Sequence, residues 1–376
     1  MSESARSRVV APIEILREAL RTSREALRDA YLKGRTPNWL LRAHARLIDR
    51  TLQDLWRSHV PSVSMALIAT GGYGRGELFP SSDVDVLVLL RGEPTPAEQE
   101  RLERLIGLFW DIGLEIGHSV RTIEACVESA AADITIETSL LEARLLAGSA
   151  ALFRRLAKAV ARSLDPVAFL KAKKLEQEQR HAKHRDTPFA LEPNLKEAPG
   201  GLRDLQVIRW MAQACGIGRH WRDLASRGLL QYDEARRLSR HETMLQDLRI
   251  RLHYLAGRRE DRIAFDYQDA LAIQCGYATK PSRRASEQLM QAYYRNAKAI
   301  TQLNTILLQN LLARFAPEPE AAPRILNERF QARGTLLEAR REDLFSREPR
   351  SILESFLLMQ QHSDLRGMAA DTLRAL

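Results

Sequence analysis

The sequence predicts an α+β protein in which a small mixed sheet is followed by an all-helical region. Short apolar runs at 64–70, 83–90 and 114–120 have the length and composition of β-strands. Most of the remaining chain instead shows apolar residues at helical spacing, with Gly and Pro between the segments. The 376 residues are enough for two or three domains, since a single core rarely grows past about 250 to 300 residues.

The first 58 residues are predicted to form a helical lead-in, with helices over 12–34 and 38–58 separated by "GRTPN". A domain built around a small sheet, which would carry the candidate nucleotide site, is expected over 59–150. It would hold the strands 64–70 and 83–90, a helix ending near Asp111, and the strand 114–120. The segment 122–148 has helical spacing and is expected to close this domain as a helix.

The second half of the chain is predicted to be nearly all helix. Helices are expected over 149–186, 201–215, 231–257 and 283–314, which defines a helical domain at 151–314. The non-helical island "TPFALEPNLKEAPGGLRDLQ" (187–206) interrupts it and is either a domain linker or a working loop. The last part, 315–376, is predicted to be a Pro-rich linker (315–325) followed by helices with short breaks.

The charge balance favours anionic partners. Lys plus Arg number 57 against 48 Asp plus Glu, which gives a net charge of +9. An Arg-rich composition without functional meaning is the alternative. Aromatic residues make up only 6% and do not alternate with basic ones as a stacking platform for single strands requires, so no nucleic-acid partner is expected.

The chain is expected to work in the cytoplasm, away from membranes. No run approaches the roughly 18 apolar residues of a membrane span, and the N-terminus lacks the pattern of a secretory signal. Cys126, Cys215 and Cys275 are scattered and show no CxxC spacing, so they are expected to be small buried residues.

The stretch "GGYGRGELFPSSDVDVLVLL" (71–90) carries the clearest chemical signal. Glycine-rich loops bind phosphates because backbone N–H groups can approach the anion closely. The P-loop pattern GxxxxGK[ST] is absent, since no Lys-Ser or Lys-Thr follows the glycines. The dinucleotide pattern also fails, because "ELFPSSD" is too short and Pro-broken for the long helix that must follow.

Two aspartates, Asp83 and Asp85, lie two residues apart on the second strand and therefore face the same side, while Val84 and Val86 face the core. Two ionised carboxylates side by side on an apolar strand are costly without a cation between them. Mg2+ is the hard ion suited to carboxylate and phosphate oxygens. We therefore expect a nucleoside triphosphate site with metal on this pair and phosphates at Gly71, Gly72, Gly74, Arg75, Ser81 and Ser82.

Gly71-Gly72 followed by Asp83-x-Asp85 resembles the signature of the DNA polymerase β-type nucleotidyltransferase superfamily. The longer string over 71–90 is more specific. Together with "LEIGHSVRT" (114–122), "TSLLEARLLAG" (138–148) and "EPNLKEAPGGLRDLQ" (192–206), it resembles the bacterial uridylyltransferase and uridylyl-removing enzyme of nitrogen control. The resemblance extends over essentially the whole chain.

This resemblance implies transfer of UMP from UTP to a tyrosine of the PII signalling protein, with release of pyrophosphate. Asp83 and Asp85 would hold two ions, one lowering the pKa of the attacking hydroxyl and the other steadying the leaving group. A third carboxylate on the next strand completes such sites. Glu115 is the candidate, with His118 nearby in the same strand.

The resemblance also implies that the island 187–206 folds over the nucleotide, with Lys196 and Arg203 on phosphates, Gly200 and Gly201 allowing close backbone approach, and Asp204 orienting the next helix. A capped turn between helices is the alternative for this island. Arg75 would steady the triphosphate, or be an ordinary surface arginine. Other side chains are expected to have structural or solvated roles. Glu77 is expected to tie down the loop, and Glu142 to be an exposed helix acid, with contact to the nucleotide as the alternative. His181 and His184 have a spacing that can hold a metal, but no third ligand is near and a solvated helical face is expected.

Three other functions remain as alternatives. A glutamine synthetase adenylyltransferase typically has an "LDLRLRP"-like third strand, where this chain has "LEIGHSVRT". A catalytically silent nucleotide-binding regulator would be favoured by loss of either aspartate, and both are present. A template-independent RNA nucleotidyltransferase would need a basic and aromatic track. Family members also carry a UMP-removing HD domain and glutamine-sensing ACT domains, and without a His-Asp dipeptide we expect this chain to lack the removing activity.

Overall fold

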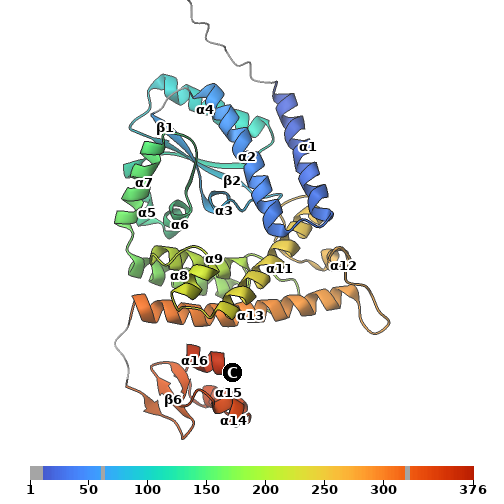
Figure 1. Ribbon diagram of the computed structural model, residues 1–376, viewed down its shortest axis with the longest axis vertical. Helices are drawn as coiled ribbons and strands as arrows, with labels where there is room; N and C mark the ends of the chain where they lie inside the picture. The colour runs from blue at the N-terminus through green and yellow to red at the C-terminus, as the bar shows by residue number, and fades with distance from the viewer. Residues whose placement is uncertain (1–11, 61–63, 318–321) are drawn as a thin grey trace, which may run out of the picture. The chain divides into compact units, whose positions relative to one another are not determined.

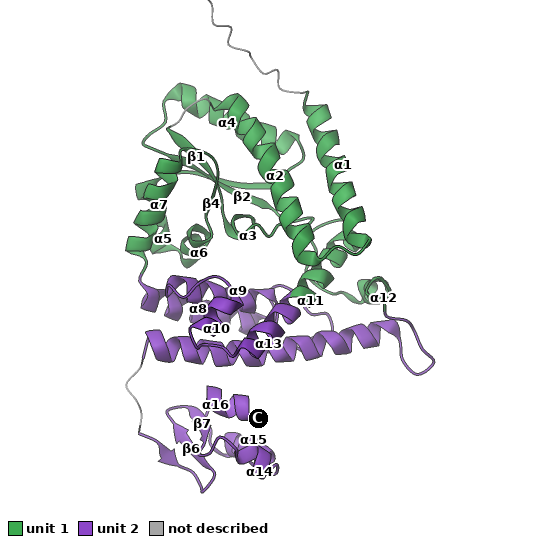
Figure 2. Ribbon diagram, in the orientation of Figure 1, with its two compact units in different colours: residues 1–164, 243–276 green, residues 165–242, 277–376 purple. Residues whose placement is uncertain are grey.

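The computed structural model describes residues 12–60, 64–317 and 322–376 (Figure 1). The chain divides into two compact units, which are coloured separately in Figure 2. Unit 1 comprises 1–164 and 243–276, and unit 2 comprises 165–242 and 277–376. This division differs from the predicted boundaries, because the segment 243–276 belongs with the N-terminal part. The predicted linker 315–325 lies partly outside the described residues.

Unit 1 contains the predicted lead-in helices and the first three strands. Its elements up to the third strand are α1 (Ile13–Leu32), α2 (Pro37–His59), β1 (Met65–Ala69), α3 (Gly71–Gly74), β2 (Val84–Leu90), α4 (Pro96–Asp111) and β3 (Ile116–Thr122). The two long helices begin at caps that the sequence encodes. Thr36 accepts a hydrogen bond from the Trp39 N–H, and Thr95 forms a reciprocal capping box with Glu98.

The rest of unit 1 was predicted less well. The segment expected to be one helix over 122–148 forms α5 (Ile123–Ala132), α6 (Ile134–Leu141) and a fourth strand, β4 (Arg144–Gly148), which is followed by α7 (Ala150–Ser163). The expected helix is wrong for β4, because a five-residue apolar run carries too little periodicity to separate strand from helix. The later segment adds the end of α11 (Tyr232–Ala256) and α12 (Phe265–Gln274), of which α12 was not predicted.

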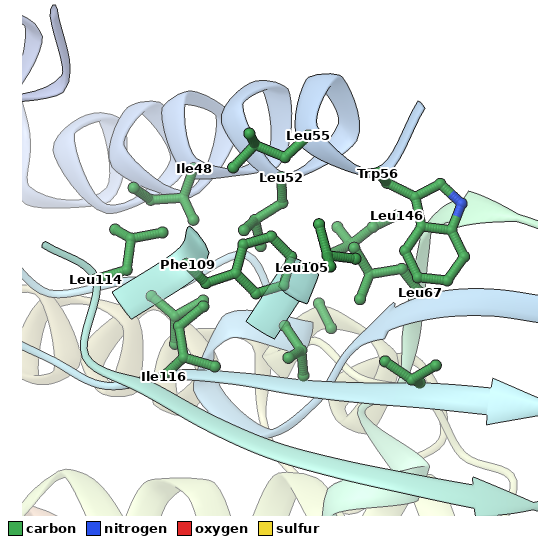
Figure 3. Close-up of a cluster of buried hydrophobic side chains, with 14 of the residues drawn as sticks. Ile48, Leu52, Leu55, Trp56, Leu67, Leu105, Phe109, Leu114, Ile116 and Leu146 are labelled. Carbon is green, nitrogen blue, oxygen red and sulfur yellow. The ribbon is translucent and has the colours of Figure 1, made fainter. Parts of the chain in front are cut away.

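The sheet of unit 1 is small and mixed, as predicted. Its strand order is β3-β2-β1-β4, with β1 antiparallel to both β2 and β4 and with β2 parallel to β3. One face packs on α2 and α4, with Ile48, Leu52, Phe109 and Leu67 among its buried side chains (Figure 3). The other face packs on α5, α6 and α7. Val84 and Val86 are buried on the first face, which confirms the predicted alternation of β2.

Unit 2 begins with helices that the sequence predicted, namely α8 (Pro166–Lys183), α9 (Leu202–Ala214), the start of α11, and α13 (Ala285–Phe315). The short helix α10 (Trp221–Ser226) was not predicted. The α+β class, with a small mixed sheet followed by helical regions, is therefore confirmed. None of the described helices has the length and apolar content needed to cross a membrane.

The tail after α13 is not the run of helices that the sequence predicted. It forms a second sheet in the order β5-β6-β7-β8, with a core of its own that includes Phe330 and Phe345. Strands of two to four residues are too short to show alternation, which explains the wrong prediction. Its elements are β5 (Arg324–Ile325), β6 (Phe330–Arg333), β7 (Leu336–Ala339), α14 (Leu344–Arg347), α15 (Ser351–Gln361), β8 (Gly367–Met368) and α16 (Ala370–Ala375).

A buried histidine, His44, lies on α2 in unit 1. It is 5% exposed, and its Nδ1 lies 3.2 Å from the Leu78 carbonyl oxygen. Burial and the positive charge of Arg24 lower the pKa of His44 to about 4, against the opposing effect of the Leu78 and Phe79 carbonyls. The folded protein therefore holds this ring neutral, with its proton on Nδ1.

This histidine makes unit 1 sensitive to acid. Below pH 6.5 the unfolded chain takes up a proton that the folded chain does not, so stability falls as the pH falls. With a folded pKa of about 4, the expected loss is about 2 kcal/mol at pH 5 relative to pH 7. Urea unfolding of wild type and His44→Gln at both pH values measures it. An equal acid loss in the two proteins would contradict this assignment.

Candidate active site

Asp83 and Asp85 lie where β1 ends and β2 begins. The Thr70 N–H at the end of β1 donates to the Asp85 carbonyl at 3.0 Å, which brings the glycine loop beside the start of β2. Asp85 is exposed, whereas Val84 and Val86 on either side of it are buried. The two aspartates therefore share the face opposite the valines, as the strand spacing predicted.

Two glycines make room for the Asp85 carboxylate. Gly117 is its register partner on β3, and a Cβ atom there would lie 2.5 Å from Asp85 Oδ1. At Gly71, which has a φ of +56°, a Cβ atom would lie 3.3 Å from Asp85 Oδ2. Sequence reasoning missed the role of Gly117, although it stands within the quoted "LEIGHSVRT". Both oxygens of Asp85 are therefore flanked by backbone without side chains.

Asp83 is paired with an arginine that sequence reasoning missed. Arg259 follows α11, and its guanidinium lies 2.5 Å from Asp83 Oδ2. Arg259 belongs to the segment 243–276, far from Asp83 in sequence but in the same unit. The Asp83 carboxylate is thus paired with a cationic side chain of the same unit.

The loop before Asp83 is held by a cluster from the same segment. The Ser81 N–H donates to His253 Nδ1 at 3.3 Å, and Asp261 lies 2.6 Å from Arg249 and 3.4 Å from His253. Burial lowers the pKa of His253, which agrees with an acceptor at Nδ1. The Ser82 N–H donates to the Phe79 carbonyl. The N–H groups of both serines thus already have acceptors, on α11 for Ser81 and within the loop for Ser82, and their hydroxyls are the groups expected to meet a phosphate.

The glycine loop forms α3, one short helical turn. The first N–H groups of a helix have no partner inside it, and no side chain caps α3. Gly74 is fixed by space, because a Cβ atom there would lie 2.3 Å from the Glu142 carbonyl oxygen. The start of α3, which contains Gly71 and Gly72, thus presents backbone N–H groups near Asp85. Binding of phosphate by these groups stays a prediction.

Arg75 is held in ion pairs beneath this loop. Its guanidinium lies 2.6 Å from Glu142 and 3.0 Å from Glu77. Burial alone would lower the pKa of Arg75, but the two carboxylates outweigh it and raise the pKa. Glu77 ties the loop as predicted. The expectation that Glu142 is an exposed helix acid is wrong, because it is 4% exposed and accepts from Arg75. A triphosphate role for Arg75 stays a prediction.

A second arginine, Arg144 on β4, fixes the same loop from another side. It donates to the carbonyls of Tyr73 at 3.1 Å and Gly74 at 3.2 Å, and it pairs with Asp49 at 2.8 Å. Glu142 and Arg144 both belong to the quoted "TSLLEARLLAG". That string therefore holds the glycine loop in place, a role that its letters alone did not reveal.

Glu115 stands opposite Asp83 in the extended register of β2 and β3, and its carbonyl accepts from the Val84 N–H at 2.8 Å. Register partners on neighbouring strands share a face, so Glu115 is on the side of the aspartates, whereas His118 is the partner of Val86. Within the described residues, no three His, Cys, Asp or Glu side chains gather to hold a metal ion. Glu115 as third carboxylate stays a prediction.

The island 187–206 belongs to unit 2. Gly200 has a φ of +77°, and a Cβ atom there would lie 2.4 Å from the Ala297 carbonyl oxygen, so α13 requires a glycine. Gly201 is similarly crowded by the Ala198 carbonyl. Asp204 accepts from the Gly200 N–H at 2.8 Å, which confirms that it orients the start of α9. The two glycines are thus accounted for by packing within the unit.

The cations of the island face Glu197. Lys196 lies 3.6 Å and Arg203 3.2 Å from its carboxylate. Their contact with phosphates stays a prediction. His181 was expected on a solvated face, which is wrong, because it lies 2.8 Å from the buried Asp204. Cys126 is buried as expected, while Cys215 and Cys275 are partly exposed.

Comparison with known proteins first defines the class of the site. The nucleotidyltransferase domain family matches residues 49–130, which include the glycine loop, both aspartates and Gly117. The GlnD PII-uridylyltransferase family matches 168–308, and the family described as the uridylyltransferase GlnD third domain matches 330–376. Unit 1 therefore carries a nucleotidyltransferase domain.

The same comparison then identifies particular relatives. The chain is 52% identical to the bifunctional uridylyltransferase/uridylyl-removing enzyme of Nitrosospira multiformis and covers 42% of it, with 96% of this chain aligned. It is 51% identical to the enzyme of that name from Aromatoleum aromaticum, covering 43% of it, with 98% of this chain aligned. Over these matched residues the chain is similar to the bifunctional uridylyltransferase/uridylyl-removing enzymes. It spans less than half the length of these relatives.

Breaking the ion pair between Arg75 and Glu142 should destabilise unit 1. In Glu142→Gln the Arg75 guanidinium loses its closest charged partner but keeps Glu77, so we expect a loss of about 1 to 3 kcal/mol. Urea unfolding measures the change. Glu18→Gln, which breaks an exposed ion pair on α1, is the matched control and should change little. Equal stability of the two variants would contradict a stabilising role for the ion pair between Arg75 and Glu142.

Adding a methyl group beside Asp85 should impair the site without unfolding the chain. In Gly117→Ala the new Cβ atom would meet Asp85 Oδ1 at 2.5 Å, so the carboxylate must move. A shift of about 1 Å in a positioned group can cost about 100-fold in rate. Nucleotidyl transfer and thermal unfolding are measured together. Gly107→Ala on α4, which has open space around it, is the control, and unchanged transfer in Gly117→Ala would contradict the crowding.

Proposed function

We propose that this chain transfers UMP from UTP to a tyrosine hydroxyl of the PII signalling protein and releases pyrophosphate. The observation that carries the proposal is the pair of same-face carboxylates beside a glycine loop, inside a matched nucleotidyltransferase domain. Similarity to known proteins supports the acceptor and the base, since the relatives are named uridylyltransferases and one matched family is described as a PII-uridylyltransferase.

The residues present fit a divalent cation such as Mg2+. Asp83 and Asp85 offer carboxylate oxygens, the donor type that Mg2+ binds, and at Gly71 and Gly117 no side chain crowds the Asp85 carboxylate. Asp83 also accepts a cationic partner, since Arg259 pairs with it. When bound, such an ion would neutralise phosphate charge and favour the ionised form of the attacking hydroxyl.

The chain's own groups would orient the reactants. The tyrosine oxygen would attack the α-phosphorus, the bond from that phosphorus to the bridging oxygen would break, and pyrophosphate would leave. Backbone N–H groups at Gly71 and Gly72 and the hydroxyls of Ser81 and Ser82 would hold phosphate oxygens. Glu115, on the same face as the aspartates, is the candidate acceptor for the hydroxyl proton. This positioning would place the nucleophile in line with the leaving group.

The rival functions have weaker support. The relatives named above are uridylyltransferases, whereas an adenylyltransferase would use ATP and a different protein acceptor. A silent regulator does not require two carboxylates on the same face of β2, and both aspartates are present. An RNA nucleotidyltransferase would extend RNA, which a primer-extension assay with each nucleotide detects. Cytoplasmic location is part of the proposal, since PII would be met there.

The proposal is tested with purified PII, Mg2+ and each of four nucleoside triphosphates labelled at the α-phosphate. We expect label on PII from UTP and its loss, by at least about 1000-fold, in Asp83→Asn plus Asp85→Asn, because both carboxylates of the proposed metal site are removed. Asp54→Asn, an exposed acid on α2, is the control. Labelling by ATP instead of UTP, or labelling by the double variant, would contradict the proposal.

A further inference from the structure

A cavity in unit 1 adjoins the candidate active site. Its volume is about 230 Å³, and helices α1, α2 and α11 and the loop before Asp83 line it. Ser81 in its wall is two residues before Asp83, and Gly257 in its wall is two residues before Arg259. Two walls of the cavity are therefore close in sequence to the pair formed by Asp83 and Arg259, and Ser81 belongs to both the cavity and the candidate site.

Arg24 is the distinctive side chain of this cavity. It is partly buried, and its Nε has no hydrogen-bond partner among the residues that the structure describes. Burial lowers the pKa of Arg24, while the charge of Glu115 opposes this effect. A guanidinium stays protonated even so, and a desolvated charge without a partner is costly. An anion bound in the cavity would remove that cost.

The other charged groups of this region already have partners. Glu25 in the cavity wall lies 2.6 Å from Arg21, and Arg28 packs 5.3 Å from the centre of the Tyr254 ring. Arg75, which the sequence offered as the cation for the triphosphate, is enclosed by Glu77 and Glu142. His44, also in the cavity wall, is neutral. Its Nε2 is an acceptor without a hydrogen-bond partner among the described residues. It therefore adds no positive charge to the cavity.

We propose that Arg24 and this cavity bind the β- and γ-phosphates of the nucleotide, and hence the pyrophosphate that leaves. Guanidinium groups suit phosphate because they donate two parallel hydrogen bonds to its oxygens. The Ser81 hydroxyl, in the same wall, is a second donor. The inference rests on the proposed function, since it assigns part of the substrate to a cavity beside the proposed metal site.

The test measures binding of inorganic pyrophosphate, UTP and UMP to the full chain in Mg2+ by calorimetry, without PII. In Arg24→Met we expect affinity for pyrophosphate and UTP to fall roughly 10- to 100-fold, since a charge-assisted hydrogen-bond donor is lost. UMP, which lacks both phosphates, should bind as before. Arg24→Lys should restore part of the loss. Arg42→Met, an exposed arginine on α2, controls for the change in net charge.

Thermal unfolding separates binding from a purely structural role. Because Arg24 is partly desolvated and its Nε has no hydrogen-bond partner among the described residues, Arg24→Met should keep or raise the unfolding temperature, whereas loss of a structural arginine would lower it. Unchanged pyrophosphate affinity in Arg24→Met, or an equal loss for UMP, would overturn the inference. Pyrophosphate that binds without competing with UTP would overturn it as well.

The two proposals fail separately. If UTP labels PII but Arg24→Met binds pyrophosphate like the wild type, only the assignment of this cavity is wrong. If Arg24→Met loses pyrophosphate but no nucleotide labels PII, the proposed acceptor or base is wrong while the anion site stands.

Discussion

The ion pair between Arg75 and Glu142 is the interaction on which the candidate site depends. It joins the end of the glycine loop to the residue that follows α6, with the two side chains 15% and 3% exposed. The same Glu142 residue contributes the carbonyl that leaves space only for a glycine at position 74. With Arg144 holding the loop from β4, the backbone N–H groups of α3 are fixed before any nucleotide arrives. Such preorganisation is what phosphoryl transfer requires, since the protein's contribution is chiefly positioning and charge.

The second constraint is the space that two glycines leave beside Asp85. Gly71 is in α3 and Gly117 is on β3, yet both are needed at the same carboxylate. The segment 243–276 then contributes Arg259 beside Asp83 and His253 behind Ser81. Unit 1 is thus completed by residues that follow the first helices of unit 2 in the chain. This arrangement explains why an apparently helical second half contains groups that bear directly on the aspartate pair.

The sequence alone predicted the parts of the site that depend on residues close together in the chain. Strand alternation placed Val84 and Val86 in the core and Asp83 and Asp85 opposite them, and the glycine loop was distinguished from a P-loop by its own letters. It was insufficient where the partner is remote. Nothing near Glu142 shows that it meets Arg75, and nothing near Arg259 shows that it meets Asp83, because both contacts depend on tertiary packing.

The sequence was also insufficient where elements are short. The strand β4 and the four strands of the tail have two to five residues, fewer than a period-two pattern needs to be recognised. The segment 243–276 was assigned to the helical domain for a similar reason. Its helix α11 is continuous across the division between the two units, and periodicity carries no information about which core a helix joins.

The central claim is that this site transfers a uridylyl group to a protein tyrosine. Tandem mass spectrometry of PII after incubation with the chain, UTP and Mg2+ tests it most directly. The account predicts a single added uridylyl group on a tyrosine oxygen, with one pyrophosphate released for each group added. Unmodified PII in the presence of folded chain, or an adduct on a residue other than tyrosine, would contradict it.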